Sequence, residues 1–414
     1  MVICRAKYHT TLEVDVAAPS LWAGIDAGKL DHHCVAIDAS GRRLLSRRVR
    51  NDEAALVALI EDVIALADGG SVQWAIDLNA GGAALAIALL LVRDQDLLYI
   101  PGRIVHHAAA AYRGDGKTDA KDAAIIADQA RMRTDLPEFR HRDETTVELR
   151  TLCARRADVS ADRNRALNRL RAQLLEYFPA LERAFDYSHR KAALILLTGY
   201  QTPEALRRIG RTRLENWLRD RHAYNPGAIV SRAMEAANAQ HIVVTGQHLA
   251  AVMVARIAQQ ILDIDAELAD LDDMIEERFS RHHQASVIRS MPGFGPLLGA
   301  ELVAATNGAL DSFPSADRLA AVAGLAPVPK DSGRITGNLK RPRRYDRRLL
   351  RVFYLAATNS IKTCPESRAY DDRKRAEGKH HRQAVLSLAR RRVNVLWAMH
   401  RDNTTYKSTA KTAA

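Results

Sequence analysis

Short apolar runs alternate with longer amphipathic stretches over the first 135 residues. Apolar runs bounded by turn residues are typical of strands, and apolar positions that recur every three or four residues are typical of helices. We therefore predict strands at 21–27, 33–38 and 41–50, a helix at 53–67, a strand at 72–77, a helix at 81–93 and a strand at 97–101. Hairpin strands followed by alternating helices and strands predict a mixed α/β sheet covered by helices.

The middle of the chain contains two long apolar seams, at 143–178 and 253–275, where apolar residues recur at spacings of three and four. Arg156 and Arg163 interrupt the first seam. Such seams predict two long helices that pair either as an antiparallel hairpin or as a dimeric coiled coil. Between them, 199–247 is predicted to form shorter helices and loops.

The distribution of charge along the chain predicts the kind of partner that the protein binds. The 414-residue chain carries a formal net charge of +12, with 61 Lys and Arg against 49 Asp and Glu. Residues 331–414 hold 21 of the basic and 7 of the acidic residues, which leaves 40 against 42 for the rest of the chain. A basic excess confined to the last fifth predicts a nucleic-acid partner. The apolar stripe within 391–402 favours a folded helix there over a free tail.

The composition predicts a cytoplasmic protein of two or three domains. The longest uncharged apolar run, 83–92, is ten residues, which is too short to span a membrane. The first 15 residues lack the apolar segment of a signal peptide. The cysteines form no C-x-x-C pair, which favours a reducing compartment; they are Cys4, Cys34, Cys153 and Cys364.

Histidine occurs in four adjacent pairs, which begin at His32, His106, His282 and His380. Neighbouring residues do not share a helix face, so such pairs are poor metal sites on helices. We predict that these histidines lie on the surface.

The stretch YRGDGKTDAKDAAIIADQA, at 112–130, contains Gly-Lys-Thr followed by aspartates. It is not a P-loop, because the first glycine of that motif would stand at Ala111 and the preceding residues predict a helix instead of a strand. Asp119 and Asp122 are three residues apart at the head of a predicted helix and share one face. The simplest interpretation of this pair alone is that Asp119 is an N-cap and Asp122 a first-turn acid.

Two further aspartates end predicted strands: Asp26 the first strand and Asp77 the fourth. Each has a plain structural interpretation as a turn residue. However, open α/β sheets present their sites at strand ends, and the helix headed by Asp119 and Asp122 follows soon after. Three or four convergent carboxylates hold hard ions such as Mg²⁺, and two such ions assist phosphoryl transfer on nucleic acids.

The third region begins with SMPGFGPLLGAELVAA, at 290–305, where Gly293 and Gly295 stand at the start of a predicted helix. Helix-hairpin-helix modules hold a DNA phosphate in this way, but a structural turn explains the glycines equally well. Further on, Ser332 lies between glycine-containing turns and a dense row of arginines. Taken alone, Ser332 is best explained as a turn residue before Gly333.

Six motifs occur in a specific order: GIDAGK, WAIDLNAGG, GKTDAKDAAIIADQARMR, MPGFGP, AGLAP and DSGR. In this order they resemble the DEDD transposases of the insertion-sequence-110 family, and the resemblance extends to LARRRVNVLWAMHRD near the C-terminus. It implies an N-terminal tail (1–20), a RuvC-like, RNase H-like catalytic domain (21–140), a helical coiled-coil region (141–284), a mainly helical transposase domain with a helix-hairpin-helix-like motif (285–362), and a basic C-terminal helix and tail (363–414). The implied fold class is α/β plus all-α.

The resemblance also implies a chemistry. Its acidic tetrad maps to Asp26, Asp77, Asp119 and Asp122, which would bind Mg²⁺ or Mn²⁺, and its nucleophilic serine maps to Ser332. The second acid of the family is glutamate, and the shorter Asp77 replaces it here. Residues expected to contact nucleic acid are Lys117, Gly293, Gly295, Arg334, Lys340, Arg341, Arg343 and Arg344.

The implied partners are donor and target DNA, a structured guide RNA, and further copies of the chain in a homodimer or homotetramer. The protein would associate with the bacterial nucleoid when it acts. Two other functions remain open from the residues: a RuvC-like junction nuclease that uses the acids and water only, and a non-catalytic basic DNA- or RNA-binding protein whose acids are caps. An actin-like ATPase is disfavoured, because no glycine-rich adenosine loop follows GIDAGK.

Overall fold

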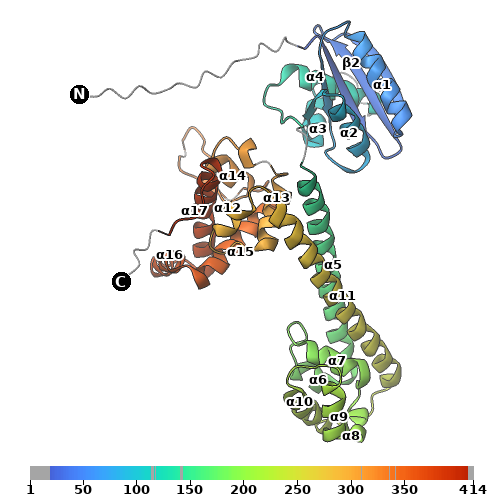
Figure 1. Ribbon diagram of the computed structural model, residues 1–414, viewed down its shortest axis with the longest axis vertical. Helices are drawn as coiled ribbons and strands as arrows, with labels where there is room; N and C mark the ends of the chain where they lie inside the picture. Colours follow the sequence, from blue (N-terminus) through green and yellow to red (C-terminus); the bar gives the residue numbers. More distant parts are fainter. Residues whose placement is uncertain are drawn as a thin grey trace, which may run out of the picture. The chain divides into compact units, whose positions relative to one another are not determined.

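The structure is a computed structural model that describes residues 19–112, 116, 118–139, 143–308, 310–334, 336–340 and 342–408. The chain divides into two compact units, Met1–His141 and Arg142–Ala414 (Figure 1). The first unit contains a five-stranded sheet, and the second is mainly helical. Each unit is described by itself below.

The sheet of the first unit is mixed. Its strands are β1 (Leu21–Ala27), β2 (Asp31–Asp38), β3 (Arg43–Arg50), β4 (Val72–Ile76) and β5 (Asp96–Tyr99). They lie in the order β3-β2-β1-β4-β5. The first three strands form an antiparallel meander, whereas β4 runs parallel to β1 and β5 parallel to β4. The predicted mixed α/β sheet is therefore confirmed, with every predicted strand present.

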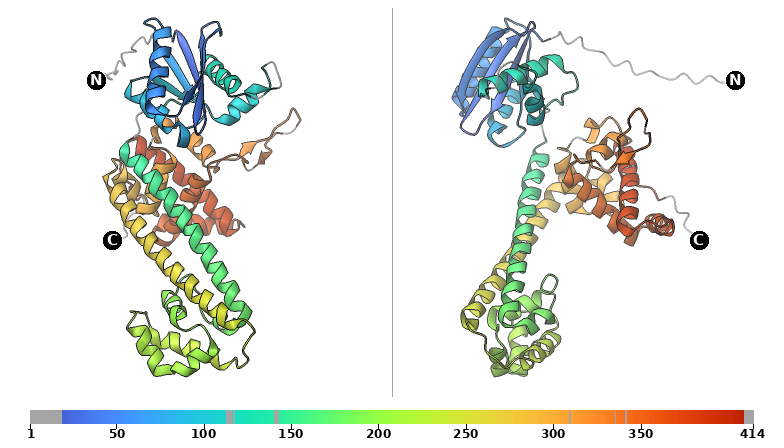
Figure 2. Two further views of the ribbon diagram at one scale, coloured as in Figure 1. Left: turned by 90° about the vertical axis from the view of Figure 1, so that its right-hand side faces the viewer. Right: turned by 180° about the vertical axis from the view of Figure 1, so that it is seen from behind.

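Helices cover both faces of this sheet (Figure 2). On one face, α1 (Glu53–Leu66) and α2 (Ala84–Val92), the latter preceded by the 3₁₀ turn η1 (Gly81–Ala83), pack over Ile25 and Trp74. On the other face, α3 (Gly102–Ala109) and α4 (Asp119–Met132) pack over Ala75 and Val35. The fully buried Trp74 shows that the sheet forms the centre of this unit's core.

Helix α4 lies unusually close to β1, and Gly24 makes this possible. A Cβ atom at Gly24 would stand 2.3 Å from the carbonyl oxygen of Ala123 and 2.4 Å from the backbone nitrogen of Ala127. Both neighbours are backbone atoms of α4, so a side chain at this position has no space unless the helix moves. The small residues on both elements therefore fix where α4 sits on the sheet.

Two long antiparallel helices, α5 (Glu144–Tyr177) and α11 (Gln247–Arg281), form the spine of the second unit (Figure 1). Ion pairs join them: Arg156 with Asp272, Arg163 with Asp265, and Glu148 with Arg278. As the residue number increases along α5, the residue number of the partner on α11 decreases, so the helices run in opposite directions. The two arginines that interrupt the first seam are thus neutralised by the second helix of the same chain. Coiled-coil winding of this pair stays a prediction.

Five shorter helices join α5 to α11. They are α6 (Pro179–Ala184), α7 (Lys191–Gly199), α8 (Pro203–Ile209), α9 (Arg211–Arg219) and α10 (Pro226–Asn238). Their core includes Tyr177 and Phe178 at the end of α5 together with Leu194. The prediction of shorter helices within 199–247 is confirmed by α8, α9 and α10.

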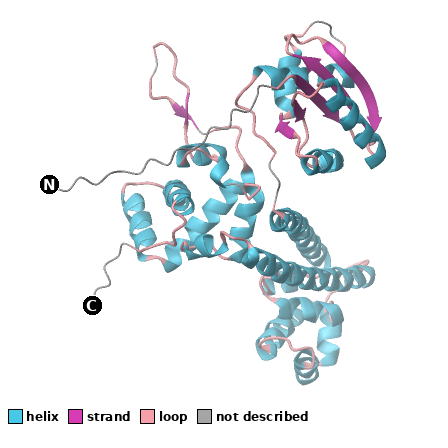
Figure 3. Cartoon of the chain, turned by 45° about the horizontal axis from the view of Figure 1, so that its top comes forward, coloured by secondary structure: helices cyan, strands magenta, loops and turns pink. Residues whose placement is uncertain are grey.

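The rest of the second unit is a helical cluster with one small hairpin. Its elements are α12 (Ala285–Ser290), α13 (Pro296–Ala305), η2 (Leu310–Ser312), α14 (Ala316–Val322), β6 (Val328–Pro329), β7 (Leu339–Lys340), α15 (Arg347–Thr363), α16 (Pro365–Ala376) and α17 (His381–Arg401). Phe279 at the end of α11 belongs to the same core as Phe353 of α15. Figure 3 shows the β6–β7 hairpin extending from these helices as a long loop.

The histidine pairs are not all on the surface. His32 is only 1% exposed and His282 only 4% exposed, so the predicted surface position is wrong for both. Burial lowers the pKa of His282 to about 4, which keeps its ring neutral near pH 7. The burial of His32 follows from its place on strand β2, because neighbouring residues on a strand point to opposite faces and only one of His32 and His33 can face the core on that side.

The sequence predicts a reducing compartment and contains no apolar run long enough to span a membrane. Cys34, Cys153 and Cys364 are free thiols in the structure. Within the described ranges, no helix is long and apolar enough to cross a membrane.

Gly24→Ala should destabilise the first unit by about 1–3 kcal/mol, because the added methyl group overlaps the backbone of α4. Hydrogen–deuterium exchange of peptides from β1 and α4, followed across a urea series, measures this loss. Gly102→Ala is the matched control, because a Cβ there meets no atom within 4 Å. Equal effects of the two substitutions would contradict the packing argument.

Candidate active site

The register of the sheet brings Asp26 and Asp77 together. Strands β1 and β4 are parallel, with Ile25 opposite Ile76, and the next residue on each is the aspartate. The backbone N–H of Ala27 donates a hydrogen bond of 3.1 Å to Oδ1 of Asp77. The two aspartates therefore lie side by side where both strands end, as the sequence predicted for strand-end carboxylates.

Helix α4 brings its first turn to the same edge. Asp26 and Gly24 are two residues apart on β1 and so face the same side of the sheet, the side that α4 covers. On α4, Asp119 and Asp122 share a helical stripe with Ala123, which contacts Gly24. Electrostatic effects agree with this placement. The negative charge of Asp122 raises the pKa of Asp77. The negative charge of Asp119 likewise favours protonated His33, which is the cross-strand neighbour of Asp26.

The carboxyl group of Asp77 lies in an unfavourable setting for its charge. Burial raises its pKa, and the negative charge of Asp122 raises it further. The hydrogen bond from Ala27 and the nearby His32 act in the opposite direction. A buried carboxyl group whose ionisation is disfavoured by burial and by a neighbouring negative charge is typical of a functional site.

The capping interpretation of Asp119 is wrong. Thr118 is the N-cap of α4, and its side chain accepts a hydrogen bond of 3.2 Å from the backbone N–H of Lys121. Asp119 and Asp122 both lie in the first turn, where acids favour the helix dipole. Because Thr118 meets the capping need, the fold does not require either carboxylate as a cap.

The elements that carry the four aspartates end or begin at one edge of the sheet, but the carboxylates do not form a ligand shell. Among the described residues, no three His, Cys, Asp or Glu side chains are grouped closely enough to hold a metal ion. All four candidates carry carboxylate oxygens, the donors that hard divalent cations prefer.

A buried histidine, His32, lies close to Asp77, and sequence reasoning missed it. Burial lowers the pKa of His32, and the side chain of Asn51 and the charge of Asp77 act in the opposite direction. Asn51 Nδ2 donates to the carbonyl of Gly82 at 3.0 Å, which ties the loop after β4 to the end of β3. Strand alternation within the His32–His33 pair was the available signal, since it places one ring in the core and the other beside Asp26.

Ser332 belongs to the second unit and lies in the loop of the β6–β7 hairpin. Backbone and side-chain hydrogen bonds close the base of this loop: the N–H of Lys330 donates to the carbonyl of Asn338 at 2.9 Å, and the N–H of Asn338 donates to Oδ1 of Asp331 at 3.0 Å. Ser332 itself is exposed, and no described residue hydrogen-bonds its hydroxyl. A turn follows directly at Gly333 and Arg334.

Exposed cations surround this hairpin. The residues in question are Arg334, Lys340, Arg343 and Arg344. None of the four forms an ion pair within the part of the chain that the structure describes. Two other residues predicted to contact nucleic acid, Lys117 and Arg341, lie outside the described residues.

The Gly-x-Gly turn before α13 has a structural explanation at one of its positions. Gly293 has φ of +92°, and a Cβ there would stand 2.0 Å from the carbonyl oxygen of Ala356 on α15. Gly295 is the N-cap of α13, and a Cβ there would meet nothing within 4 Å. Packing on α15 thus requires Gly293, whereas a phosphate grip by either glycine stays a prediction.

Comparison with known proteins places the chain among insertion-element proteins. Residues 23–179 match the DEDD transposase family of IS110, described as "Transposase", and residues 285–372 match the "Transposase IS116/IS110/IS902 family". The chain is 63% identical to the 42 kDa protein of insertion element IS900 from Mycobacterium paratuberculosis, over 96% of this chain and 100% of that protein.

Two Streptomyces proteins extend the comparison. Identity is 49% to the 44.8 kDa protein of IS116 from Streptomyces clavuligerus, over 92% of this chain and 95% of that protein. It is 35% to the 43.6 kDa protein of IS110 from Streptomyces coelicolor, over 95% and 97%. These matches confirm the resemblance on which the sequence prediction rests. The chain belongs to the IS110 family of insertion-element transposases and is an enzyme of the DNA recombinase class.

Proposed function

We propose that this transposase cuts and rejoins DNA strands with a divalent metal held by Asp26, Asp77, Asp119 and Asp122, and with Ser332 as the nucleophile. The support for the proposal is that the elements carrying the four aspartates end or begin at one sheet edge. Strand register supplies two of them, and the close packing of α4 at Gly24 supplies the other two.

The donor set fits Mg²⁺ or Mn²⁺. Oδ1 of Asp77 accepts the N–H of Ala27, which orients the carboxylate. Asp77 and Asp122 are both acids, and the negative charge of Asp122 disfavours ionised Asp77. A divalent cation between them would relieve this repulsion. When bound, such a cation polarises a phosphoryl oxygen and lowers the pKa of the attacking hydroxyl.

Ser332 would conserve the energy of the DNA bond. Its Oγ attacks the phosphorus atom, an Oγ–P bond forms, and the P–O bond to one neighbouring sugar breaks to release a hydroxyl group. The Oγ proton would pass to water, and the departing sugar oxygen would take up a proton from water, with the serine hydroxyl activated by the metal ion that the tetrad would hold. A hydroxyl of a different DNA end then attacks the phosphoserine and restores the free serine, so rejoining needs no ATP. The step requires Ser332 and a tetrad to meet on one phosphate, in one chain or between subunits of a homodimer or homotetramer.

The cations around the hairpin would hold the nucleic-acid backbone. Arg334, Lys340, Arg343 and Arg344 are exposed and carry charges that no described carboxylate neutralises. The family resemblance adds a structured RNA from the same element, which would select donor and target DNA by base pairing. The concentration of basic residues in 331–414 supports a polyanionic partner of this kind.

Asp119→Asn and Asp122→Asn should each reduce strand cleavage by at least about 100-fold, because the amide replaces a metal-binding carboxylate. Cleavage of a labelled DNA end in the presence of Mg²⁺ and the RNA encoded by the element measures this. Thr118→Ala is the matched control, since it removes the cap and costs about 1 kcal/mol of stability but no ligand. If the two Asn variants cleave normally and only lose stability, the acids are structural and the protein is a binding module.

Ser332→Ala should abolish the covalent protein–DNA adduct, detected as labelled DNA that stays with the denatured protein on a gel. Thr336→Val removes a hydroxyl from the same exposed loop and should leave the adduct intact. Recombination by the Ser332→Ala variant would refute the serine mechanism. Cleavage without any adduct would instead identify a RuvC-like nuclease that uses water.

Asp77→Asn should stabilise the metal-free first unit near pH 7 while abolishing cleavage. The folded-state pKa of Asp77 is raised, so its contribution favours folding at low pH and is lost as pH rises through that pKa. The uncharged Asn escapes this loss and still accepts the N–H of Ala27. The gain should vanish below the ordinary pKa near 3.8. Urea midpoints of β1 and α4 peptides in EDTA, at several pH values, measure it.

Addition of Mg²⁺ separates the metal site from a plain charge effect. Mg²⁺ should raise the unfolding midpoint of the wild-type first unit and raise that of Asp77→Asn much less. Equal stabilisation of both proteins would show that Asp77 is not a ligand.

A further inference from the structure

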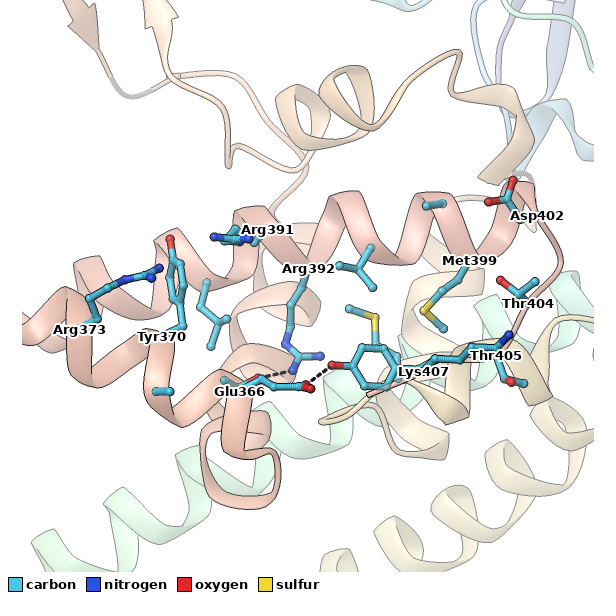
Figure 4. Close-up of a pocket in the computed structure, with 17 residues that line it drawn as sticks. Glu366, Tyr370, Arg373, Arg391, Arg392, Met399, Asp402, Thr404, Thr405 and Lys407 are labelled. Carbon is cyan, nitrogen blue, oxygen red and sulfur yellow. Dashed lines mark hydrogen bonds between the residues drawn. The ribbon is translucent and has the colours of Figure 1, made fainter. Parts of the chain in front are cut away.

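A groove between α16 and α17 is lined by arginine side chains that the proposed cleavage reaction does not use. Its volume is about 720 Å³, within the usual range for ligand sites. The segment that follows α17 runs along it, with the backbone N–H of Tyr406 donating to the hydroxyl of Ser290 at 2.8 Å. Figure 4 shows the side chains of both helices and of this segment meeting in the groove.

Arg392 lines the groove and is only 5% exposed. One terminal nitrogen donates to the carbonyl of Pro292 at 2.7 Å, and the other donates to the hydroxyl of Ser367. The thiol of Cys364 also interacts with the guanidinium, but Nε has no hydrogen-bond partner among the described residues. A buried guanidinium with an unused donor is costly and favours an acceptor from a ligand.

The acid beside Arg392 already accepts bonds from neutral donors. Glu366 accepts from the hydroxyl of Tyr406 at 2.6 Å and from the hydroxyl of Ser408 at 2.7 Å. The other acid of the groove, Asp402, pairs with Arg401 at 2.7 Å. The acids of the groove therefore have partners of their own.

Two further arginines flank an aromatic ring at one end of the groove. The guanidinium carbons of Arg373 and Arg391 lie 5.0 and 5.1 Å from the ring centroid of Tyr370, on either side of it in Figure 4. Neither arginine forms an ion pair with a described carboxylate. A cation–π contact orients a guanidinium without cancelling its charge, so both remain able to bind phosphate.

An aromatic ring flanked by oriented guanidiniums above a partly apolar floor suits a single-stranded nucleic acid, whose phosphate the guanidiniums can hold and whose base the apolar floor can cover. The apolar part of the floor comes from Met291, Leu388 and Met399. The charge of this region also favours a nucleic-acid ligand, because residues 365–408 include 11 Lys and Arg against 5 Asp and Glu. The volume suits one nucleotide, and a base can enter such a groove only when it is unstacked from its neighbours.

We propose that this groove binds one unstacked nucleotide of a single-stranded nucleic acid. Its phosphate lies on Arg373 and Arg391, and its base enters beside Tyr370 toward the unused donor of Arg392. The inference goes beyond the proposed function, because it involves none of the four aspartates and does not involve Ser332. The groove would hold a nucleic-acid strand while the residues of the proposed active site cut that strand.

Fluorescence anisotropy of the full chain with labelled dT₁₂ and rU₁₂ in EDTA tests the site without any cleavage. Arg391→Glu and Tyr370→Leu should each weaken binding about tenfold, whereas Tyr370→Phe, which keeps the ring, should bind normally. Arg391→Glu should also lower the slope of log affinity against log salt by about 0.7 for each phosphate that the variant no longer binds. Thymidine monophosphate should compete better than inorganic phosphate.

Arg382→Glu is the matched control. It makes the same charge change on α17 nine residues earlier, which places it on the opposite side of the helix. It should change affinity by less than about twofold. Equal losses for Arg382→Glu and Arg391→Glu would overturn the groove in favour of a general basic surface. Equal losses of duplex and single-strand binding for Arg391→Glu, or equal competition by inorganic phosphate and the nucleotide, would also overturn it. Failure of the aspartate and serine variants to affect cleavage would leave these binding results unchanged.

Discussion

The contact between α4 and β1 at Gly24 is the constraint on which the candidate site depends. A helix normally lies on a sheet at a distance set by side chains, but here backbone meets backbone because Gly24 has none. The position of α4 along β1 is thereby fixed, and with it the position of the first helical turn. Asp119 and Asp122 stand at the strand ends because Ala123 and Ala127 are held against Gly24.

This packing gathers negative charge at a cost to stability. Burial and the charge of Asp122 both penalise ionised Asp77. The compensating terms come from elsewhere in the unit, including the fully buried Trp74 and Ile76 of β4 and the Thr118 cap of α4. A fold that keeps a buried carboxyl group beside a second acid, and supports it with a separate cap and core contacts, is typical of a site maintained for chemistry.

The sequence predicted elements well where apolar patterning was strong. Strand β1 has the predicted bounds, because its apolar run is clear and a polar turn follows. Strand β2 begins two residues before the predicted start, at Asp31, because pairing with β1 continues through His32 although the local pattern is polar. The predicted cap of α4 is one residue late, since Thr118 and Asp119 are both good caps and local sequence does not choose between them.

Features that depend on distant residues were beyond prediction. The requirement for Gly293 arises from the carbonyl of Ala356, and the partners of Arg392 come from Pro292 and Ser367. No local pattern joins these positions. The same holds for Arg156 and Arg163, which interrupt the apolar seam in the sequence but pair with Asp272 and Asp265 of α11 in the structure. Ion pairs inside an apolar seam contribute little net stability, but they disfavour every register that leaves one charge unpaired.

Charge is divided between the two units in a way that bears on mechanism. The aspartates of the first unit repel a nucleic-acid backbone, and without a cation they would weaken its binding. The unneutralised cations near Ser332 and beside Tyr370 belong to the second unit, and these attract the same backbone. Under the proposed function, nucleic-acid binding and metal-dependent chemistry would depend on separate sets of residues. A divalent cation would then have two effects at once, since it would supply reactivity and remove the repulsion that keeps phosphate from the aspartates.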